Sequence, residues 1–169
     1  EYASVSIRRN RLRARGALLE VGSRQLRFSV DEASDLLTER RHLELQGEQI
    51  TRIHERTEGW PAALWLVSIA LAQHADPTTV IDGFSGSYSA VAEYLAEEVL
   101  VRQPESVKTF LLRTSIVDHF SAALSDAICD RNDSASVLAE LERDNLFLIA
   151  LGDRDKTYRY HALFKEFLY

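Results

Sequence analysis

The feature that most constrains this fold is Gly59-Trp60-Pro61, which is followed by the apolar segment "AALWLVSIALA" at residues 62–72. This segment has apolar residues on nearly every helical face, which indicates a helix buried on most sides. Gly59 ends the polar, amphipathic helix that we expect at residues 49–58. Pro61 takes the first position of the next helix, where a missing N–H is tolerated. The sequence therefore predicts two consecutive helices joined by an abrupt corner.

Composition and charge narrow the class of protein. The 169 residues are 46% hydrophobic and 27% charged, which suits one or two small globular domains, and the net charge of −6 fits nucleic acid poorly. The single cysteine, Cys129, excludes an internal disulfide framework, fits a reducing compartment and is expected to be a partly buried, unreactive thiol. The apolar run at 61–72 is about half of what a bilayer requires. We therefore expect a cytoplasmic protein without a membrane partner.

The chain is expected to be a piece of a larger protein, because it opens on Glu1 without methionine or signal peptide. Five arginines between residues 8 and 15 favour a short helix ending near Gly16, or a turn leading into a strand. They would either contact phosphates or form a solvated face. "RQLRFSV" (24–30) predicts a strand, and "DEASDLLTERR" (31–41) predicts a helix. With no partner nearby, residues 25–28 should be frayed, form a small hairpin or pair with a second copy.

The second half predicts a winged-helix arrangement. A loop with one short helix at residues 74–89 is the expected domain boundary. Beyond it, the apolar spacing predicts four helices, and residues 145–151 and 158–161 predict two strands joined by a polar turn, before a last helix at 162–169. The inward-facing residues of the first two helices are predicted to be Val91, Tyr94, Leu95, Val99, Val107, Phe110, Leu111 and Ile116.

The winged-helix outline raises the alternative of DNA binding, and charge argues against it. The helix before the wing, at residues 133–144, carries Asp133, Glu140, Glu142 and Asp144 against Arg143 alone, which gives 1 − 4 = −3. A duplex would repel such a helix in the major groove. The sequence also contains no phosphate-binding loop, nucleophile elbow or dinucleotide fingerprint, and its five histidines lack metal-ligand spacing. We therefore expect no catalytic or metal-binding residues in this chain.

Four blocks of the sequence resemble one family. In order and spacing, "LRARGALLEVGSRQLRFSVDEA" (12–33), "TEGWPAALWLVSIAL" (57–71), the stretch at 84–118 and the stretch at 138–168 are similar to the large MalT-like, LuxR-type transcriptional regulators. Those regulators are multidomain signal-transduction (STAND-class) ATPases. Residues 1–10 depart from the family's usual proline-containing stretch and have no assigned role.

The resemblance implies a mainly α chain of three parts. Residues 1–33 would be the C-terminal remnant of an α/β nucleotide-binding domain, residues 34–85 a helical domain carrying Gly-Trp-Pro, and residues 86–169 a winged-helix domain with a small β-hairpin wing. The phosphate-binding loop and the magnesium ligands would lie upstream. The sensor repeats and the promoter-binding helix-turn-helix would lie downstream. The cofactor implied is ATP or ADP, held together with the upstream domain, and self-association is implied for the parent.

The resemblance also implies site residues. The turn at Gly59, Trp60 and Pro61 would contact the nucleotide base, and His161 would contact the β-phosphate of ADP. Strand alternation places Tyr158 and Tyr160 on one face, so we expect His161 to point freely across a cleft between domains. Before the resemblance is considered, a plain helix boundary and a locally bonded histidine account for the same residues.

The function expected is therefore a regulatory switch in a nucleotide-dependent, LuxR-type activator. With ADP the winged helix would dock and close the molecule, and with inducer and ATP it would swing away and permit self-association. This chain alone is expected neither to hydrolyse ATP nor to bind duplex DNA at moderate salt. Two alternatives stay open, a DNA-binding winged-helix repressor and a helical protein-interaction module without nucleotide contact.

Overall fold

The structure is a computed structural model that describes residues 11–12, 14–17, 19, 23–152 and 156–169. Residues 8–10 and 13 of the arginine-rich segment lie outside these residues, and Gly16, which follows the segment, has a positive φ of 64°. The elements are α2 (Ser23–Leu26), α3 (Val30–Ser34), η1 (Asp35–Arg40), α4 (Gly47–Thr57), α5 (Pro61–Gln73), α6 (Pro77–Gly83), α7 (Ser89–Tyr94), η2 (Leu95–Leu100), α8 (Glu105–Thr114), α9 (Ala122–Cys129), α10 (Ser134–Arg143), β1 (Leu148–Ala150), β2 (Tyr158–Tyr160) and α11 (Ala162–Leu168).

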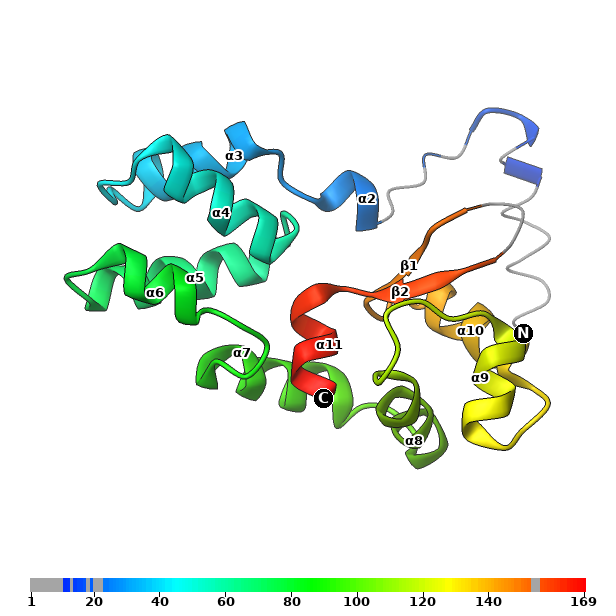
Figure 1. The fold of residues 1–169 in the computed structure, drawn as a ribbon. Coiled ribbons are helices and arrows are strands. Elements are labelled where there is room, and N and C mark those ends of the chain that lie inside the picture. The colour runs from blue at the N-terminus through cyan, green and yellow to red at the C-terminus, as the bar shows by residue number, and fades with distance from the viewer. Residues whose placement is uncertain (1–10, 13, 18, 20–22, 153–155) are drawn as a thin grey trace.

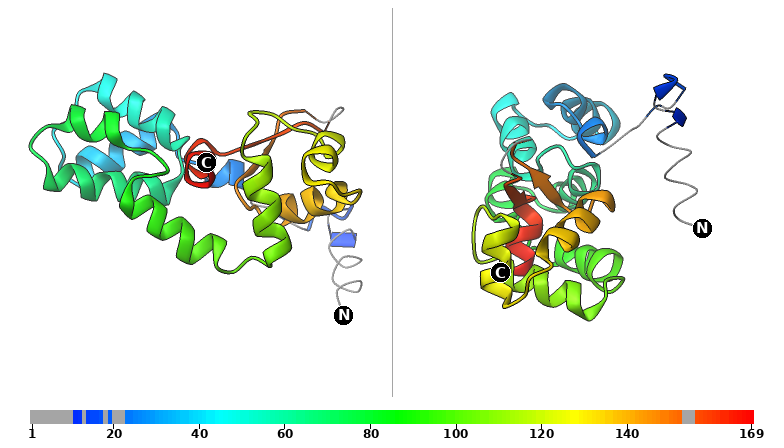
Figure 2. Two further views of the ribbon diagram at one scale, coloured as in Figure 1. Left: turned by 60° about the horizontal axis from the view of Figure 1, so that its bottom comes forward. Right: turned by 90° about the vertical axis from the view of Figure 1, so that its right-hand side faces the viewer.

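The helices form two groups with α11 between them (Figure 1). One group contains α3 to α6, and the other contains α8 to α10 with the β-hairpin. The continuous helix formed by α7 and η2 leads from the first group toward the second, as the left view of Figure 2 shows. Buried apolar side chains form one cluster that extends from Ala33 in α3 to Leu168 in α11. The mainly α fold class is thus confirmed.

The start of α3 is fixed by a local sequence signal. The Ser29 hydroxyl accepts a bond from the backbone N–H of Glu32, and the Glu32 carboxylate accepts one from the backbone N–H of Ser29. This capping box satisfies two N–H groups that a helix start leaves without helical partners. The helix predicted from residue 31 therefore begins at Val30, and it continues as the wider π-helical segment η1 to Arg40.

The two helices at the corner behave as their sequences predict. The amphipathic α4 buries Ile50 and Ile53. The following helix, α5, begins with Pro61 at its first turn, and the residues it buries lie on several faces: Ala63, Leu64, Val67, Ser68, Ala70 and Leu71. Trp65 is an exception, since it is 48% exposed. The Arg41 guanidinium lies 4.5 Å from the Trp65 ring centroid, which gives this aromatic surface a cationic neighbour.

The winged-helix part consists of α8, α9, α10, the hairpin and α11. Strands β1 and β2 are antiparallel, and Ile149 is paired with Arg159. On its other side β2 forms a bridge with Phe120, through backbone bonds between Phe120 and Tyr158 in both directions. Two inward-facing predictions were wrong, because Ile116 is 62% exposed and Tyr94 is 37% exposed. Ile116 lies after the end of α8, so the helical spacing that was used to place it does not extend that far.

The strand predicted at residues 24–30 was wrong. Residues 23–26 form the short helix α2 instead, and no hairpin involves residues 25–28 in the described part of the chain. The backbone of Phe28 finds other partners: its N–H donates to the Gly59 carbonyl at 2.8 Å, and its carbonyl accepts from His54 Nε2 at 2.8 Å. The corner between α4 and α5 thus takes the place of a neighbouring strand. No helix in the described residues is long and apolar enough to cross a membrane.

Candidate functional site

The corner between α4 and α5 has an unusual backbone. Glu58, the C-terminal cap of α4, is left-handed at φ 47° and ψ 33°, and Gly59 follows at φ 68°. The Trp60 N–H then turns back to the Thr57 carbonyl at 2.9 Å. Pro61 follows as the first residue of α5. Two successive residues with positive φ reverse the chain within one turn, which explains why the corner is so abrupt.

Gly59 is required by both conformation and space. A Cβ at this position would lie 2.2 Å from the Phe28 carbonyl oxygen and 3.2 Å from His54 Nε2. A positive φ already disfavours any side chain. Because the nearest atom belongs to the backbone, a rotamer change cannot relieve the contact. Gly59 therefore lets the segment at Phe28 lie directly on the corner.

A cavity of about 480 Å³ adjoins the corner and contains three of the four predicted site residues. Trp60, Pro61 and His161 line it, whereas Gly59 does not. The other lining residues come from the segment before α3, from α5, and from the chain leading into and along β1: Leu26, Arg27, Phe28, Ala62, Asn145, Phe147, Leu148 and Ile149. Segments far apart in the sequence therefore meet at one largely apolar cavity.

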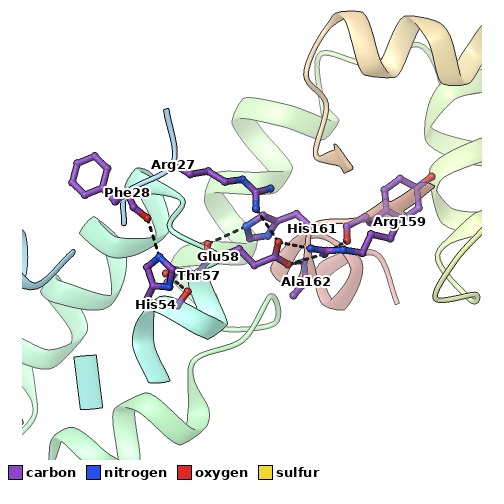
Figure 3. Close-up of polar contacts among 9 residues, drawn as sticks. Arg27, Phe28, His54, Thr57, Glu58, Arg159, His161 and Ala162 are labelled. Atoms are coloured by element: carbon purple, nitrogen blue, oxygen red, sulfur yellow. Dashed lines mark hydrogen bonds and ion pairs between the residues drawn. The ribbon is translucent and has the colours of Figure 1, made fainter. Parts of the chain in front are cut away.

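His161 points across the domain boundary to α4, but it is not free there, so the expectation of a free side chain was wrong. Only 3% of the residue is exposed, and Nε2 donates to the Thr57 carbonyl at 3.0 Å. The strand alternation does hold for Tyr158 and Tyr160, which are buried, and for Arg159, which is partly exposed. It fails at His161 because β2 ends at Tyr160 and this residue instead caps α11. Figure 3 shows the imidazole directed at the end of α4.

The second ring nitrogen of His161 has no hydrogen-bond partner among the described residues. Nδ1 is buried and forms no hydrogen bond with the described residues. Since Nε2 carries the hydrogen that Thr57 accepts, Nδ1 is an acceptor in the neutral ring and a donor only in the cation. Burial lowers the pKa of His161, the Glu58 charge opposes this, and the Arg27 charge adds to it. The neutral imidazole is therefore the favoured form here.

Aromatic rings hold this histidine between the two helical groups. Trp60 forms an edge-to-face contact with His161 at 5.8 Å and another with Phe147 at 4.9 Å. Phe147 also stacks on Phe164 of α11 at 4.9 Å. Trp60 additionally meets Tyr94 of α7 at 5.6 Å. Trp60 is thus the aromatic residue through which the corner contacts the winged helix.

Sequence reasoning missed the most connected polar residue of the site, Glu58. Its carboxylate accepts from Arg159 Nη1 at 2.9 Å, from Arg159 Nη2 at 2.8 Å and from Arg27 Nη1 at 3.1 Å. The backbone N–H of Ala162 adds a bond at 2.9 Å. Figure 3 shows these groups converging on Glu58 from two segments, one carrying Arg27 and the other carrying Arg159 and Ala162. The Glu58 side chain is 14% exposed.

Two sequence signals pointed to this cluster. Glu58 directly precedes the Gly-Trp-Pro turn, so its side chain had to lie at the corner. Arg159 interrupts the aromatic alternation of the second strand, on the face opposite Tyr158 and Tyr160. Nothing local pairs these residues, because they lie 101 positions apart. Their pairing therefore required the tertiary structure.

The ionisation of Glu58 follows from its partners. Burial alone raises the pKa of this carboxyl, but the Arg159 bonds, the nearby His161, the Ala162 N–H and the Arg159 charge lower it to about 2. The same pairing raises the pKa of Arg159. Both groups are therefore charged throughout the ordinary pH range, and their contact is a charge-assisted, forked hydrogen bond.

Other potentially reactive side chains in the described residues are not activated. No group of histidine, cysteine or acidic side chains there is arranged to hold a metal ion. Cys129 is partly buried, and burial is the main cause that raises the pKa of its thiol. A thiol held protonated is a weak nucleophile. The site is thus a cavity with a charged cluster beside it.

Three helices followed by a two-stranded wing and a last helix define a winged-helix domain. Residues 96–169 match the family described as the MalT winged helix domain. The similarity extends beyond this domain: the chain is 30% identical over 159 residues to the HTH-type transcriptional regulator MalT of Vibrio cholerae, an alignment that covers 93% of this chain and 18% of the regulator.

Two further relatives extend this similarity. The MalT regulator of Klebsiella pneumoniae subsp. pneumoniae is 31% identical over 159 residues, covering 93% of this chain and 18% of that protein. The serine/threonine-protein kinase PknK of Mycobacterium tuberculosis is 33% identical over 159 residues, covering 94% of this chain and 14% of the kinase. The chain therefore spans less than a fifth of the length of these curated relatives.

Proposed function

We propose that this chain is the regulatory switch of a nucleotide-responsive, MalT-like transcriptional regulator. In this proposal it closes the molecule by docking its winged helix on the group of helices α3 to α6, called the helical group below, while ADP is held at the corner. The observation that carries the proposal is the cavity at which Trp60, Pro61 and His161 meet. The nucleotide would be shared with a separate nucleotide-binding domain that supplies the phosphate loop and the Mg²⁺ ligands.

The lining of the cavity is compatible with a nucleotide base. Phe28, Trp60, Pro61 and Phe147 provide apolar surfaces, and the side chains of Asn145 and His161 provide polar groups. Planar heterocycles bind well between such surfaces when a few polar groups fix their orientation. Arg27 also lines the cavity, but Glu58 already pairs with its charge. The base is therefore the part of a nucleotide that these residues fit best.

Contact between His161 and a phosphate would require a proton. Its Nε2–H is engaged by the Thr57 carbonyl, so only Nδ1 is available, and a neutral ring cannot donate from that atom. A phosphate contact therefore needs either the imidazolium or release of the Thr57 bond. If the imidazolium makes the contact, ADP binding is accompanied by the uptake of a proton. Bound ADP would then raise the pKa of His161, whereas burial lowers it.

The relatives support a regulatory role for this region more than a role as a catalytic or DNA-binding domain. The same region of this chain aligns with a protein kinase and with HTH-type transcriptional regulators. A segment shared by a kinase and by transcriptional regulators fits a role that both require, such as control of activity. For the present chain the MalT-type winged helix favours the transcriptional branch.

Direct DNA binding by the winged helix is disfavoured by charge. Glu140 and Glu142 on α10, and Asp133 and Asp144 at its two ends, are all exposed. These carboxylates occupy the position from which a recognition helix would meet phosphates. Promoter binding would accordingly belong to another domain of the natural protein. The chain alone should show neither ATP turnover nor salt-dependent affinity for duplex DNA.

The test compares ADP binding and transcription in the natural protein that contains this sequence. His161→Ala should weaken ADP binding and raise inducer-independent transcription, and Pro61→Ala should also weaken ADP binding. If the imidazolium makes the contact, ADP affinity should increase more on acidification in the unmodified protein than in the His161→Ala variant. His119→Ala is the matched control, because His119 is exposed on the same domain and lies outside the cavity. Unchanged ADP affinity in both site variants would favour the protein-interaction module instead.

A further inference from the structure

The Glu58 carboxylate joins two parts of the chain that are remote in sequence, the segment before α3 and the junction of β2 with α11. Arg27 belongs to the segment before α3, Arg159 to β2, and Ala162 to the start of α11. Glu58 itself caps the end of α4 in a left-handed conformation. A side chain in this position is displaced from the helix axis, so it can reach groups beyond both helices of the corner. Figure 3 shows the carboxylate between the two guanidinium groups.

We propose that Glu58 is a latch that couples the position of the segment at residues 27–29 to the docking of the winged helix on the helical group. While Arg27 is bonded to Glu58, two independent segments hold the carboxylate. The carboxylate is then already oriented for its bonds to Arg159 and Ala162. When the segment moves, the carboxylate loses one of its fixed partners and binds the winged helix less firmly. The latch uses only groups of this chain and does not depend on nucleotide binding.

The geometry distinguishes the two arms of the latch. Arg159 makes two bonds to Glu58 at 2.9 and 2.8 Å, one to each carboxylate oxygen. Arg27 makes one bond at 3.1 Å. A forked pair fixes both distance and orientation, whereas a single bond can be exchanged more readily. The Arg159 arm is therefore the anchor, and the Arg27 arm is the one that responds to movement.

Other contacts of the same segment make this coupling mechanical. Phe28 bonds to Gly59 through its N–H and to His54 through its carbonyl. A displacement of residues 27–29 would thus disturb the backbone next to Glu58 as well as the Arg27 bond. On the other side, His161 bonds to Thr57, the residue before Glu58. The segment and the winged helix therefore act on adjacent residues of one turn.

Amide hydrogen exchange on the chain and its variants tests the latch. Glu58→Gln keeps the shape of the side chain and removes its charge. It should accelerate exchange roughly tenfold or more at residues 159–168 and also at residues 27–33, because bonds to a charged group are lost on both sides. Glu55→Gln is the matched control, since Glu55 lies on the same helix and is exposed. It should leave both stretches unchanged.

The two arms give the discriminating comparison. Arg159→Gln should accelerate exchange at 159–168 and, to a smaller degree, at 27–33. Combining it with Glu58→Gln should add little, because both variants remove the same contact. The latch is overturned if Glu58→Gln affects only one of the two stretches, or if the double variant shows the product of the single effects.

A general loss of structure is recognised from α10, which should keep its protection in every latch variant. If Glu58→Gln removes protection throughout the chain, Arg159→Lys replaces it in the comparison. Lysine keeps the charge but loses the fork, so a milder acceleration at both stretches supports the latch. Acceleration confined to residues 159–168 overturns it.

Discussion

The two sides of the α4–α5 corner hold the winged helix by different physics. On one side Trp60 packs against Phe147 and His161, and these contacts are apolar and aromatic. On the other side Glu58 is bonded to Arg27 and Arg159 through a fully charged cluster. Trp60 and Glu58, only two positions apart, therefore provide one contact that depends on buried apolar area and one that depends on charge.

This difference indicates a division of roles. Apolar contacts are weakly directional, so the Trp60 side can stabilise a range of closely related docked positions. The Glu58 side is directional, because a forked guanidinium pair fixes both the distance and the angle of its partner. Docking strength should therefore come mainly from the aromatic side, whereas the carboxylate side should define the docked position.

Gly59→Ala should disrupt both sides at once and give the largest loss of stability. The added Cβ meets the Phe28 carbonyl and is strained at the positive φ, so the free energy of unfolding should fall by about 3–5 kcal/mol. Chemical denaturation measures this change. Gly47→Ala is the control, because nothing lies within 4 Å of its Cβ position and the change should be within about 0.5 kcal/mol. Equal effects at the two glycines would contradict the close approach at Gly59.

Trp60→Ala isolates the aromatic side. Removal of the partly buried indole should lower the free energy of unfolding by about 2–4 kcal/mol, since its contacts with Phe147, Tyr94 and His161 are lost. The loss should be nearly independent of pH. Trp65→Ala, at the exposed tryptophan of the same helix, should lose about 1 kcal/mol or less. A comparable loss at Trp65 would show that indole size matters here and position does not.

Glu58→Gln isolates the charged side. The pKa of this carboxyl is lowered from 4.5 to about 2 in the folded chain. Its stabilisation is therefore complete above 4.5 and is lost as the pH falls from 4.5 toward 2. At neutral pH the variant should be less stable by about 2–3 kcal/mol, and the difference should shrink across this window. Denaturation at several pH values measures it, and a constant difference down to the lowest pH would contradict the charged contact.

His161→Gln should produce the smallest change and sharpen the comparison, because this residue touches both sides. Loss of its bond to Thr57 should lower stability by about 0.5–1.5 kcal/mol at neutral pH. Burial lowers the pKa of His161 below 6.5, so the unmodified chain should lose stability as the pH falls below 6.5 toward the folded value. The variant should lack this particular pH dependence. Parallel pH profiles for the two proteins would exclude a neutral, buried His161.

The predictability of the fold differs between the wing and the segment before α3. The hairpin was predictable because both strands and their turn lie within residues 145–161, so each strand carries its own partner. The segment at 24–30 has strand-like composition, but a strand needs a neighbour, and α2 forms instead. The sequence pattern alone could not show that Phe28 would bond to Gly59, 31 residues away in sequence, and to His54, 26 residues away.

The site was predictable to the extent that it rests on local signals or on resemblance. Trp60, Pro61 and His161 do meet at one cavity, although their role in binding nucleotide stays a prediction. The bond from His161 to Thr57 and the pairing of Glu58 with Arg159 were not predictable, because each joins residues more than a hundred positions apart. Helical and strand periodicities specify which face is buried, and they do not specify which polar groups will meet across a domain boundary.

The bridge between Phe120 and Tyr158 has a consequence for how copies of this chain behave in concentrated solution. It occupies the outer edge of β2 with backbone bonds in both directions, so another strand cannot add at that position. The opposite edge of the sheet belongs to β1, which carries Leu148 and Ile149 and has no second neighbouring strand within the described residues. Edge strands with free backbone groups are the usual templates for intermolecular association. Self-aggregation should therefore begin at β1, and a lysine in place of Ala150, whose side chain is exposed, should suppress it.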